Sequence, residues 1–322
     1  MLQIVEHLGP ELTLFEQRLE QTLQSDVQLV QEIAKYLMAT KGKRLRPALA
    51  ILSAQVVGEL ADGVFDAAVA IEMIHTATLI HDDVVDSSTI RRGVASVNSI
   101  WDNQISVLMG DFLFSRALAL LVKLDSKEAL FSLSRATERI SKGELFEIEK
   151  SQDLTMMEAT YFQMIGDKTA ALFSAACEIG AVLARGSAEE IAAMTKFGET
   201  FGLAFQMTDD LLDFIGDAST LGKPIGNDVR SRKVTLPLIQ ALTVCGDGKA
   251  HDIRDQIEMG IDSDEVWHGI VDFVEDYGGI AYTQKMASQY AASAAETLQQ
   301  LRPSSARDIL YDAVLQTTTR QW

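Results

Sequence analysis

Proline is scarce in this sequence, and its scarcity bears on the fold. The chain has 322 residues and only five prolines: Pro10, Pro47, Pro224, Pro237 and Pro303. Because proline ends or kinks a helix, the long stretches without it allow long helices. Apolar residues recur at helical spacing through most of the chain, and no run alternates convincingly as a strand would. The sequence therefore predicts an all-α fold.

Cysteine, a targeting segment and a membrane-spanning run are also lacking. Cys177 and Cys245 are the two cysteines, far apart and in no metal-ligand spacing, so we expect two buried thiols in a reducing compartment. The first residues contain neither the basic segment nor the apolar segment of a signal peptide. No apolar run reaches the roughly 18 residues of a membrane helix. We therefore expect a cytoplasmic protein without stable membrane insertion.

Basic residues are also few compared with acidic ones. Lys and Arg number 28 and Asp and Glu 46, which gives a formal net charge of −18. Phosphate backbones and anionic lipid surfaces both require clusters of Lys and Arg, so we predict no nucleic-acid partner and no basic membrane anchor. An anionic substrate would need a local basic cluster or a bound metal ion to overcome the overall repulsion.

Loop-like stretches interrupt the helical pattern but do not mark domain boundaries. They occupy residues 41–47, 86–96, 165–167 and 216–233. No low-complexity linker or change of composition separates them, so we predict one domain, a large helical bundle over residues 1–322. Residues 48–60 and 105–124 are apolar on most faces, which indicates full burial or a subunit contact.

Two acidic motifs of identical spacing, D-D-x-x-D, follow apolar helical segments. They consist of Asp82, Asp83 and Asp86, and of Asp209, Asp210 and Asp213. On a helix the first and last acids of each motif share a face, where like charges repel and unpaired carboxylates are costly in an apolar setting. A divalent cation removes that cost, and carboxylate oxygens suit Mg²⁺. A solvated acidic helix end is the alternative, but the repetition favours a metal site.

Basic residues lie at helix ends and in loops around these motifs. They are Lys43, Arg44 and Arg46, Arg91 and Arg92, Lys168 beside Thr169 at an expected helix start, and Lys223 and Lys233. Each by itself is explained as a surface charge. Together they fit a substrate with two anionic groups, one held through metal by the acids and the other held directly by Arg and Lys.

These segments resemble the trans-isoprenyl diphosphate synthases of the polyprenyl synthase family. The matching pieces, in the family's order, are GKRLRP, LIHDDVVDSSTIRRG, MGDFLFSRAL, GDKTAALF, FQMTDDLLDFIGD and GKPIGNDVRSRKVTLP. The resemblance implies a single-domain, all-α isoprenoid synthase bundle around a central active-site cavity, and a homodimer. It also implies a Mg²⁺-dependent, head-to-tail condensation of isopentenyl diphosphate with an allylic diphosphate, which we expect to be farnesyl diphosphate.

The resemblance further implies roles for individual residues. Asp82, Asp86 and Asp209 would bind Mg²⁺, with Asp83, Asp210 and Asp213 as further ligands or through water. The allylic diphosphate would contact Arg91, Lys168 and Lys223, and isopentenyl diphosphate would contact Lys43, Arg46, His75 and Arg92. Thr169, Gln206 and Lys233 would line the reaction centre. We expect the departing diphosphate to act as the base.

The helix that carries Asp82 also bears on product length. Ala77 and Thr78 lie one turn back and Ile74 two turns back, and each turn rises about 5.4 Å, roughly one isoprene unit. Small residues next to the motif resemble the octaprenyl and heptaprenyl synthases, although close packing of another helix would explain them too. We expect an open tunnel and a long-chain product, for use as a quinone side chain.

Three alternatives stay open from the sequence alone. A farnesyl or geranylgeranyl diphosphate synthase would share the catalytic residues and differ in tunnel depth. For the open, long tunnel that we favour, the floor must come from a deeper helix, with Phe131 and Leu133 as candidates. A terpene cyclase would differ in its second metal motif. A non-catalytic subunit of a heteromeric synthase would be expected to have lost acids that are present here.

Overall fold

The computed structural model describes residues 4, 7–40, 42–150, 153–216, 226–261 and 263–319. Their secondary structure is almost entirely helical, which confirms the predicted all-α class. The chain divides into two compact units, and each is described by itself. Unit 1 comprises Met1–Thr137, Leu172–Gly198 and Glu296–Ala313, and unit 2 comprises Glu138–Ala171, Glu199–Ala295 and Val314–Trp322. The expectation of a single domain stays a prediction.

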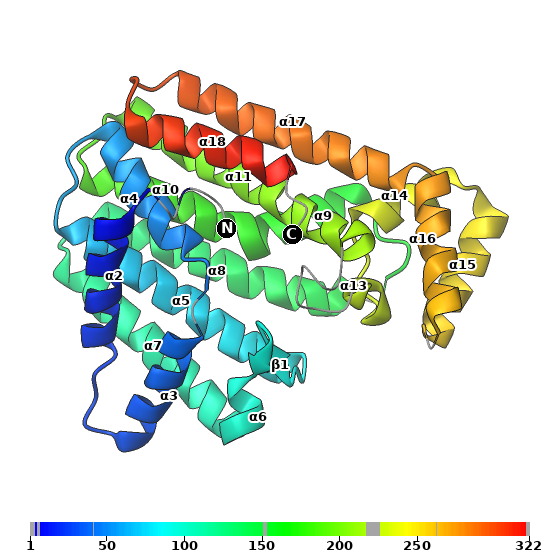
Figure 1. The fold of residues 1–322 in the computed structure, drawn as a ribbon, viewed down its shortest axis with the longest axis horizontal. Coiled ribbons are helices and arrows are strands. Elements are labelled where there is room, and N and C mark those ends of the chain that lie inside the picture. The colour runs from blue at the N-terminus through cyan, green and yellow to red at the C-terminus, as the bar shows by residue number, and fades with distance from the viewer. Residues whose placement is uncertain are drawn as a thin grey trace. The chain divides into compact units, whose positions relative to one another are not determined.

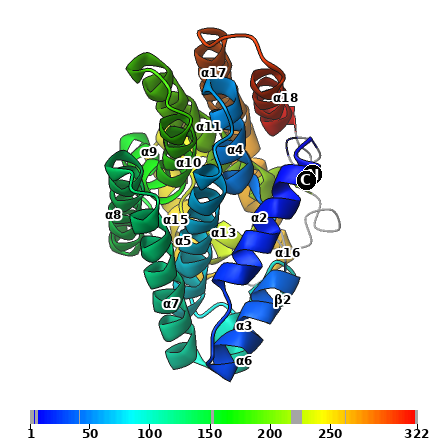
Figure 2. The same ribbon diagram turned by 90° about the vertical axis from the view of Figure 1, so that its left-hand side faces the viewer.

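Unit 1 is organised around two apolar helices, α4 and α5. Its elements are α2 (Gly9–Thr22), α3 (Gln28–Ala39), α4 (Leu45–Val57), α5 (Gly63–Val85), β1 (Ile90–Arg91), β2 (Val94–Ala95), α6 (Val97–Trp101) and α7 (Asn103–Lys123). Nearly every residue of α4 is buried. Helix α5 packs against both α4 and α7, and α7 lies beside it in both ribbon views (Figures 1 and 2). The core of unit 1 thus encloses the helix that ends in the first acidic motif.

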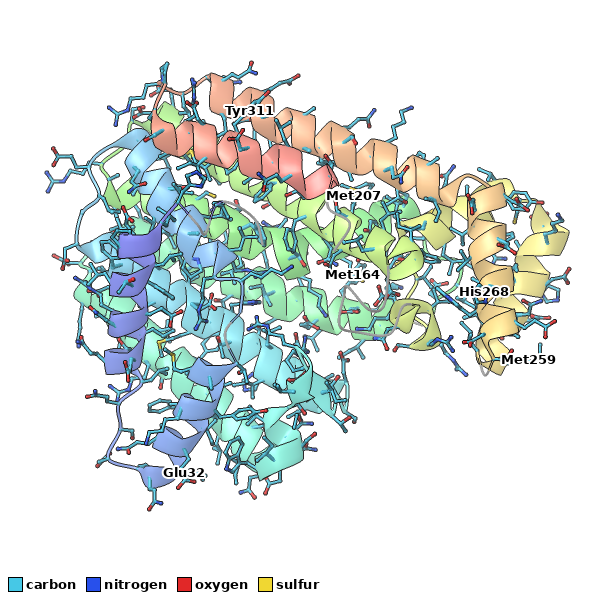
Figure 3. The ribbon with its side chains drawn as sticks, viewed as in Figure 1. Glu32, Met164, Met207, Met259, His268 and Tyr311 are labelled. Atoms are coloured by element: carbon cyan, nitrogen blue, oxygen red, sulfur yellow. The ribbon has the colours of Figure 1, made fainter. Side chains whose placement is uncertain are left out.

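Unit 2 has a core of its own. Its elements are α9 (Glu158–Ile165), the π-helical turn η1 (Gly166–Ala170), α13 (Asn227–Arg230), α14 (Leu236–Val244), α15 (Asp247–Met259) and α16 (Asp264–Asp276). Met164 of α9 and Met207 lie in this core, and both are labelled in Figure 3. Pro237 in the first turn of α14 and the Ser263 cap of α16 mark two of the helix starts.

Among the described elements, five helices contain residues of both units. They are α8 (Lys127–Lys150), α10 (Ala171–Leu183), α11 (Ala188–Ile215), α17 (Gly279–Gln299) and α18 (Ser305–Thr319). The first acidic motif ends α5, in unit 1, and the second lies in the last turns of α11, in unit 2.

Several expectations about local structure were wrong. Residues 165–167 do not break a helix, because η1 continues α9 into α10. A short antiparallel hairpin, β1–β2, occurs where no strand was expected. By contrast, the segment 105–124 was expected to be fully buried or to form a subunit contact. Leu108 and Val122 of α7 are 59% and 65% exposed, which rules out full burial within one chain and leaves the subunit contact as a prediction.

Within the part of the chain that the structure describes, two helices have the length and hydropathy of a membrane span, Gly63–Val85 and Asn103–Lys123. Of the most apolar window in each, 67% is buried in α5 and 33% in α7. Burial explains α5 as a core helix, because core helices of soluble proteins meet the same criterion.

Candidate active site

The first acidic motif presents its three aspartates to different surroundings. Asp82 is half-buried in the last turn of α5, and Asp86, four residues on, is exposed at the helix end. Asp83 is buried, and its Oδ1 accepts hydrogen bonds from Arg91 Nε at 2.8 Å and Nη2 at 2.6 Å. The helical geometry therefore separates the outer acids, which share a face, from the middle acid, which has an arginine partner.

The residues Arg91, Arg92 and Gly93 belong to the β1–β2 hairpin. Arg92 and Gly93 are the two turn residues, with φ of +54° and +79°, as a type I′ turn requires. The Arg92 guanidinium lies against the backbone of Gly42, where an added Cβ would be 2.5 Å from its Nη1. The hairpin thus directs one arginine to Asp83 and the next to the segment that precedes α4.

Arg46, His75 and Arg92 form a basic cluster in unit 1. Arg46 Nη1 donates to His75 Nε2 at 3.0 Å. Burial, together with the charges of Arg46 and Arg92, lowers the pKa of His75 well below its ordinary value, so the imidazole is neutral. Burial also lowers the pKa of Arg46 to about 10, with Arg92 contributing. Within the described chain, the buried Nε of Arg46 has no hydrogen-bond partner.

A buried glutamate accompanies this cluster, and the sequence did not single it out. Glu72 is 3% exposed, and its Oε1 accepts from Arg44 Nη1 at 2.6 Å. Arg44 Nε also donates to Glu16 Oε1 at 2.8 Å. These two acids engage Nε and Nη1 of Arg44, whereas its buried Nη2, like Nε of Arg46, has no hydrogen-bond partner among the described residues.

The second acidic motif is more deeply buried. Asp209 is half-buried, whereas Asp210 and Asp213 are 5% and 1% exposed. Asp210 accepts from Tyr161 Oη at 2.6 Å and Gln206 Nε2 at 2.7 Å. Burial, and then the charge of Asp228, raises the pKa of Asp210 to about 8. Asp213 Oδ2 accepts from the backbone N–H of Asp228 at 2.9 Å, which anchors the start of α13.

Lys168 and Thr169 lie in the π-helical turn η1. Thr169 Oγ1 donates to Gln206 Oε1 at 2.7 Å, so a continuous chain of hydrogen bonds links Thr169, Gln206 and Asp210. Turns of this kind are rare and often occur at functional sites. The structure thus brings two predicted reaction-centre residues into contact, and it does so through a helix type that apolar periodicity does not reveal.

Two glutamates of α8, missed in the sequence, hold the predicted lysines. Lys168 Nζ lies 2.9 Å from Glu144 Oε1 and also pairs with Glu147, whose Oε1 is 3.1 Å from Lys233 Nζ. Burial favours protonation of Glu147, but the two ammonium groups outweigh it and hold its pKa below the ordinary value. Lys168 and Lys233 therefore share one carboxylate. The i, i+3 spacing of these acids was the available signal.

Most of the remaining predicted residues lie just before α4 or on α5. Lys43 is exposed just before α4, and Lys223 lies outside the described residues. Ile74 and Ala77 of α5 are buried, and Thr78 is half-buried, with its hydroxyl donating to the His75 carbonyl. Leu133 is buried, but the expectation that Phe131 forms a tunnel floor was wrong, because its ring is 68% exposed.

A small cavity of about 70 Å³ lies in unit 1. Arg44, Asp83, Arg91 and Arg92 line it together with apolar side chains of α2, α3 and α5. Because ligand pockets commonly measure roughly 300–1,000 Å³, this cavity is too small for a prenyl chain.

The acids of each motif, taken separately, have the chemistry that a hard divalent cation prefers. In unit 1, Asp82 and Asp86 offer carboxylate oxygens from one face of α5, and in unit 2 Asp209 of α11 offers its own. Among the described residues, no three Asp, Glu, His or Cys side chains converge as a complete metal centre. Mg²⁺ commonly takes only one or two carboxylates and completes its shell with water and substrate phosphates, so incomplete protein sites of this kind suit it.

The chain is similar to known proteins over most of its length. A family model described as polyprenyl synthetase matches residues 27–273. The chain is 38% identical over 288 residues to an octaprenyl diphosphate synthase of Escherichia coli, covering 89% of each chain. It is 34% identical over 316 residues to a short chain isoprenyl diphosphate synthase of Methanothermobacter thermautotrophicus, covering 96% of each.

A solved structure agrees with these sequence relatives. The polyprenyl synthase from Caulobacter crescentus, complexed with calcium and isoprenyl diphosphate, matches with a TM-score of 0.93 and 36% identity. The match covers 99% of this chain and 98% of that one.

Proposed function

Because the chain belongs to the polyprenyl synthetase family, we propose that it condenses isopentenyl diphosphate with an allylic diphosphate to make a long-chain polyprenyl diphosphate. It is a prenyltransferase that elongates a prenyl diphosphate. The observation that carries the substrate class is the basic cluster of Arg46, neutral His75 and Arg92 on and beside the helix that ends in Asp82 and Asp86. Farnesyl diphosphate is the proposed primer.

Isopentenyl diphosphate is proposed to bind at the basic cluster. Arg46 has a buried N–H to offer an anion, and the neutral His75 accepts from Arg46 and so orients its guanidinium. A site with surplus positive charge and an unsatisfied donor gains most from a diphosphate, because charge-assisted hydrogen bonds are the strongest available. Lys43, three residues before Arg46 in the sequence, is proposed to add a further charge.

The allylic diphosphate is proposed to lie at the acidic motifs. Asp82, Asp86 and Asp209 would hold Mg²⁺, which when bound supplies neutralising charge to the leaving diphosphate. Arg91, Lys168 and Lys223 would contact the same diphosphate, so that its developing charge is stabilised as the allylic C–O bond breaks. The isopentenyl double bond then attacks the cation, and the departing diphosphate takes the proton.

Long product length is proposed from α5. Buried, small Ala77 and half-buried Thr78 precede Asp82 by about one helical turn, and Ile74 precedes Ala77 by three residues. We expect Ala77→Phe to shorten the product and Ile74→Ala to leave it as long or longer, because a side chain beside the tunnel limits chain growth. A shorter product from Ala77→Phe, together with a product of equal or greater length from Ile74→Ala, would indicate a steric plug and not general damage to α5. Unchanged product length in Ala77→Phe would remove this argument.

The direct test is a product analysis. The purified protein is incubated with Mg²⁺, labelled isopentenyl diphosphate and farnesyl diphosphate, and the dephosphorylated products are separated by chain length. Products well beyond geranylgeraniol support the proposal. A single addition keeps the transferase activity but overturns the long-chain assignment in favour of a short-chain synthase, the activity named for the archaeal relative. No incorporation with any allylic primer overturns the proposed function of the chain alone.

We also propose a cytoplasmic homodimer that supplies quinone side chains. Support for the dimer comes from α7, where Val107, Leu108, Leu118 and Val122 are 42%, 59%, 44% and 65% exposed. Exposed apolar side chains gathered on one helix commonly mark a subunit contact. Sedimentation of the purified protein at micromolar concentration is expected to give twice the chain mass, and a monomer would contradict the proposal.

A further inference from the structure

Arg139 of α8 binds three groups on and beside the π-helical turn η1. Its Nε donates to Asp167 Oδ1 at 2.7 Å, and its Nη2 donates to the Gly166 carbonyl at 3.0 Å. Its Nη1 and Nη2 also donate to the two carboxylate oxygens of Glu199 in α11, at 3.0 and 2.7 Å. One guanidinium therefore connects α8, the start of η1 and α11 within unit 2.

The Gly166 carbonyl is the acceptor that defines the π-helical turn. The backbone N–H of Ala171, five residues on, donates to it, where an α-helix would use the residue four positions on. Arg139 supplies this carbonyl with a second, charge-assisted donor. The hydrogen bonds that Arg139 donates to Glu199 and then to Asp167 raise its pKa above the ordinary value, so the guanidinium stays charged.

The same face of α8 approaches η1 again one turn later. A Cβ on Gly143 would lie 3.0 Å from the backbone N of Lys168 and 3.1 Å from Asp167 Cβ, so the absence of a side chain permits this contact. Glu144 and Glu147, the next acids on α8, hold the Lys168 ammonium. Helix α8 thus contacts both the backbone and the side chains of the turn that carries Lys168 and Thr169.

We propose that Arg139 is a positioning residue that holds η1 in its π-helical form, so that Lys168 and Thr169 face the allylic substrate. The proposal rests on the proposed function of Lys168 as a contact of the allylic diphosphate. Without Arg139 the turn can relax toward α-helical hydrogen bonding, which changes the direction of the following side chains by about 100° per residue of register. The effect is specific, because the residues proposed to bind isopentenyl diphosphate belong to unit 1.

Steady-state kinetics of the full-length protein test the positioning role. Arg139→Met is expected to raise the KM for the allylic diphosphate or lower kcat roughly ten- to hundred-fold, since small misplacements of a substrate-binding group have effects of this size. The KM for isopentenyl diphosphate should stay within about two-fold of wild type, because the residues proposed to bind this substrate are unchanged. Arg139→Lys should recover part of the loss, because it keeps the charge but not the planar fork.

Arg135→Met is the matched control. Arg135 lies one turn earlier on α8 and also forms an ion pair, but with Glu178, 2.7 Å away and outside η1. Its loss should leave both KM values and kcat unchanged. Equal losses in Arg135→Met and Arg139→Met would overturn the proposal, because general weakening of α8 would then explain both.

Gly143→Ala tests the same contact from the other side. Alanine favours a helix over glycine, so an effect on α8 alone would raise the unfolding temperature and leave activity intact. Displacement of η1 by the new methyl group predicts weaker allylic binding without loss of stability. Wild-type kinetics in Gly143→Ala would contradict the close coupling of α8 to η1.

Amide hydrogen exchange separates this inference from the proposed function. Exchange in the segment 161–173 should become faster in Arg139→Met and remain as in wild type in Arg135→Met, whether or not the protein turns over substrate. Unchanged exchange in Arg139→Met overturns the proposed hold on η1. Faster exchange with unchanged allylic kinetics overturns the positioning role, and an inactive wild type overturns the proposed function instead.

Discussion

The two D-D-x-x-D motifs are spelled alike, yet their second and last aspartates have different neighbours. Asp83 pairs with the charged guanidinium of Arg91, whereas Asp210 accepts from the neutral groups of Tyr161 and Gln206. Asp86 is exposed at the end of α5, whereas Asp213 is buried and holds the start of α13. Identical spacing therefore predicts which acids share a helical face but not which of them are charged, buried or already engaged in structure.

The first acids of the two motifs are alike in being half-buried, and they are expected to be equally essential. Asp82→Ala and Asp209→Ala should each lower turnover at least about 10³-fold, since both remove a carboxylate proposed to hold the metal that stabilises the leaving diphosphate. Incorporation of labelled isopentenyl diphosphate measures the loss, and circular dichroism checks that the helices persist. Retained activity in both variants would refute the metal assignment, and loss in only one would break the symmetry between the motifs.

The second acids should respond differently to neutralisation. Asp83→Asn removes the charge opposite Arg91 and is expected to cost about 1–3 kcal/mol in the free energy of unfolding, discounted for the partly exposed Arg91 side chain. Asp210→Asn should cost less than about 1 kcal/mol near neutral pH, because an amide resembles a carboxyl group that is already protonated.

Denaturant unfolding of the two variants and wild type, in the presence of a chelator, measures this difference. The chelator keeps bound metal from adding to the stability of any one protein. A larger loss in Asp210→Asn than in Asp83→Asn would reverse the comparison and indicate that Asp210 is ionised in the folded protein.

The pH dependence of stability should also distinguish the buried His75 of unit 1 from the buried Asp210 of the second acidic motif. The pKa of His75 is lowered by burial and by Arg46, Arg92, Arg91 and Arg44, so the unfolded chain binds a proton that the folded chain excludes. Stability should therefore fall as the pH falls below about 6.5, the ordinary histidine value. In His75→Gln, stability should decrease less as the pH falls. Thermal unfolding of this variant and of wild type between pH 7.5 and 5 measures the difference.

Asp210 should act with the opposite sign. Because its folded pKa is raised from 3.8 to about 8, the folded chain keeps a proton that the unfolded chain releases. Its contribution to stability should decrease as the pH rises from about 4 to about 8 in metal-free protein. For His75, an equal decrease in stability between pH 7.5 and 5 in wild type and in His75→Gln would show that this histidine is not the source of the acid sensitivity.

Local patterns in the sequence were enough for much of the site. The spacing of the acids placed Asp82 and Asp86 on one face of α5. Helical periodicity accounts for the placement of these acids, because it depends on residues a few positions apart. Thr169 and Gln206 were expected at the reaction centre from the family resemblance; they are hydrogen-bonded to each other, and their role there stays a prediction.

Other features could not be read from the sequence. The pairing of Asp83 with Arg91, the neutral state of His75, and the glutamates that hold Lys168 all depend on which side chains face one another after folding. The π-helical turn was mistaken for a break, because Gly166 and Asp167 are typical of loops and nothing nearby in sequence indicates Arg139.

The sequence by itself determined the helical class, the positions of both acidic motifs and the family of the chain, because these depend on residue type and short-range spacing. The tertiary structure decided which carboxylates are paired, which histidine is neutral and which helix supports Lys168. Those properties follow from burial and from the charge of distant neighbours, which shift a group's proton affinity and occupy its hydrogen bonds only once the chain has folded.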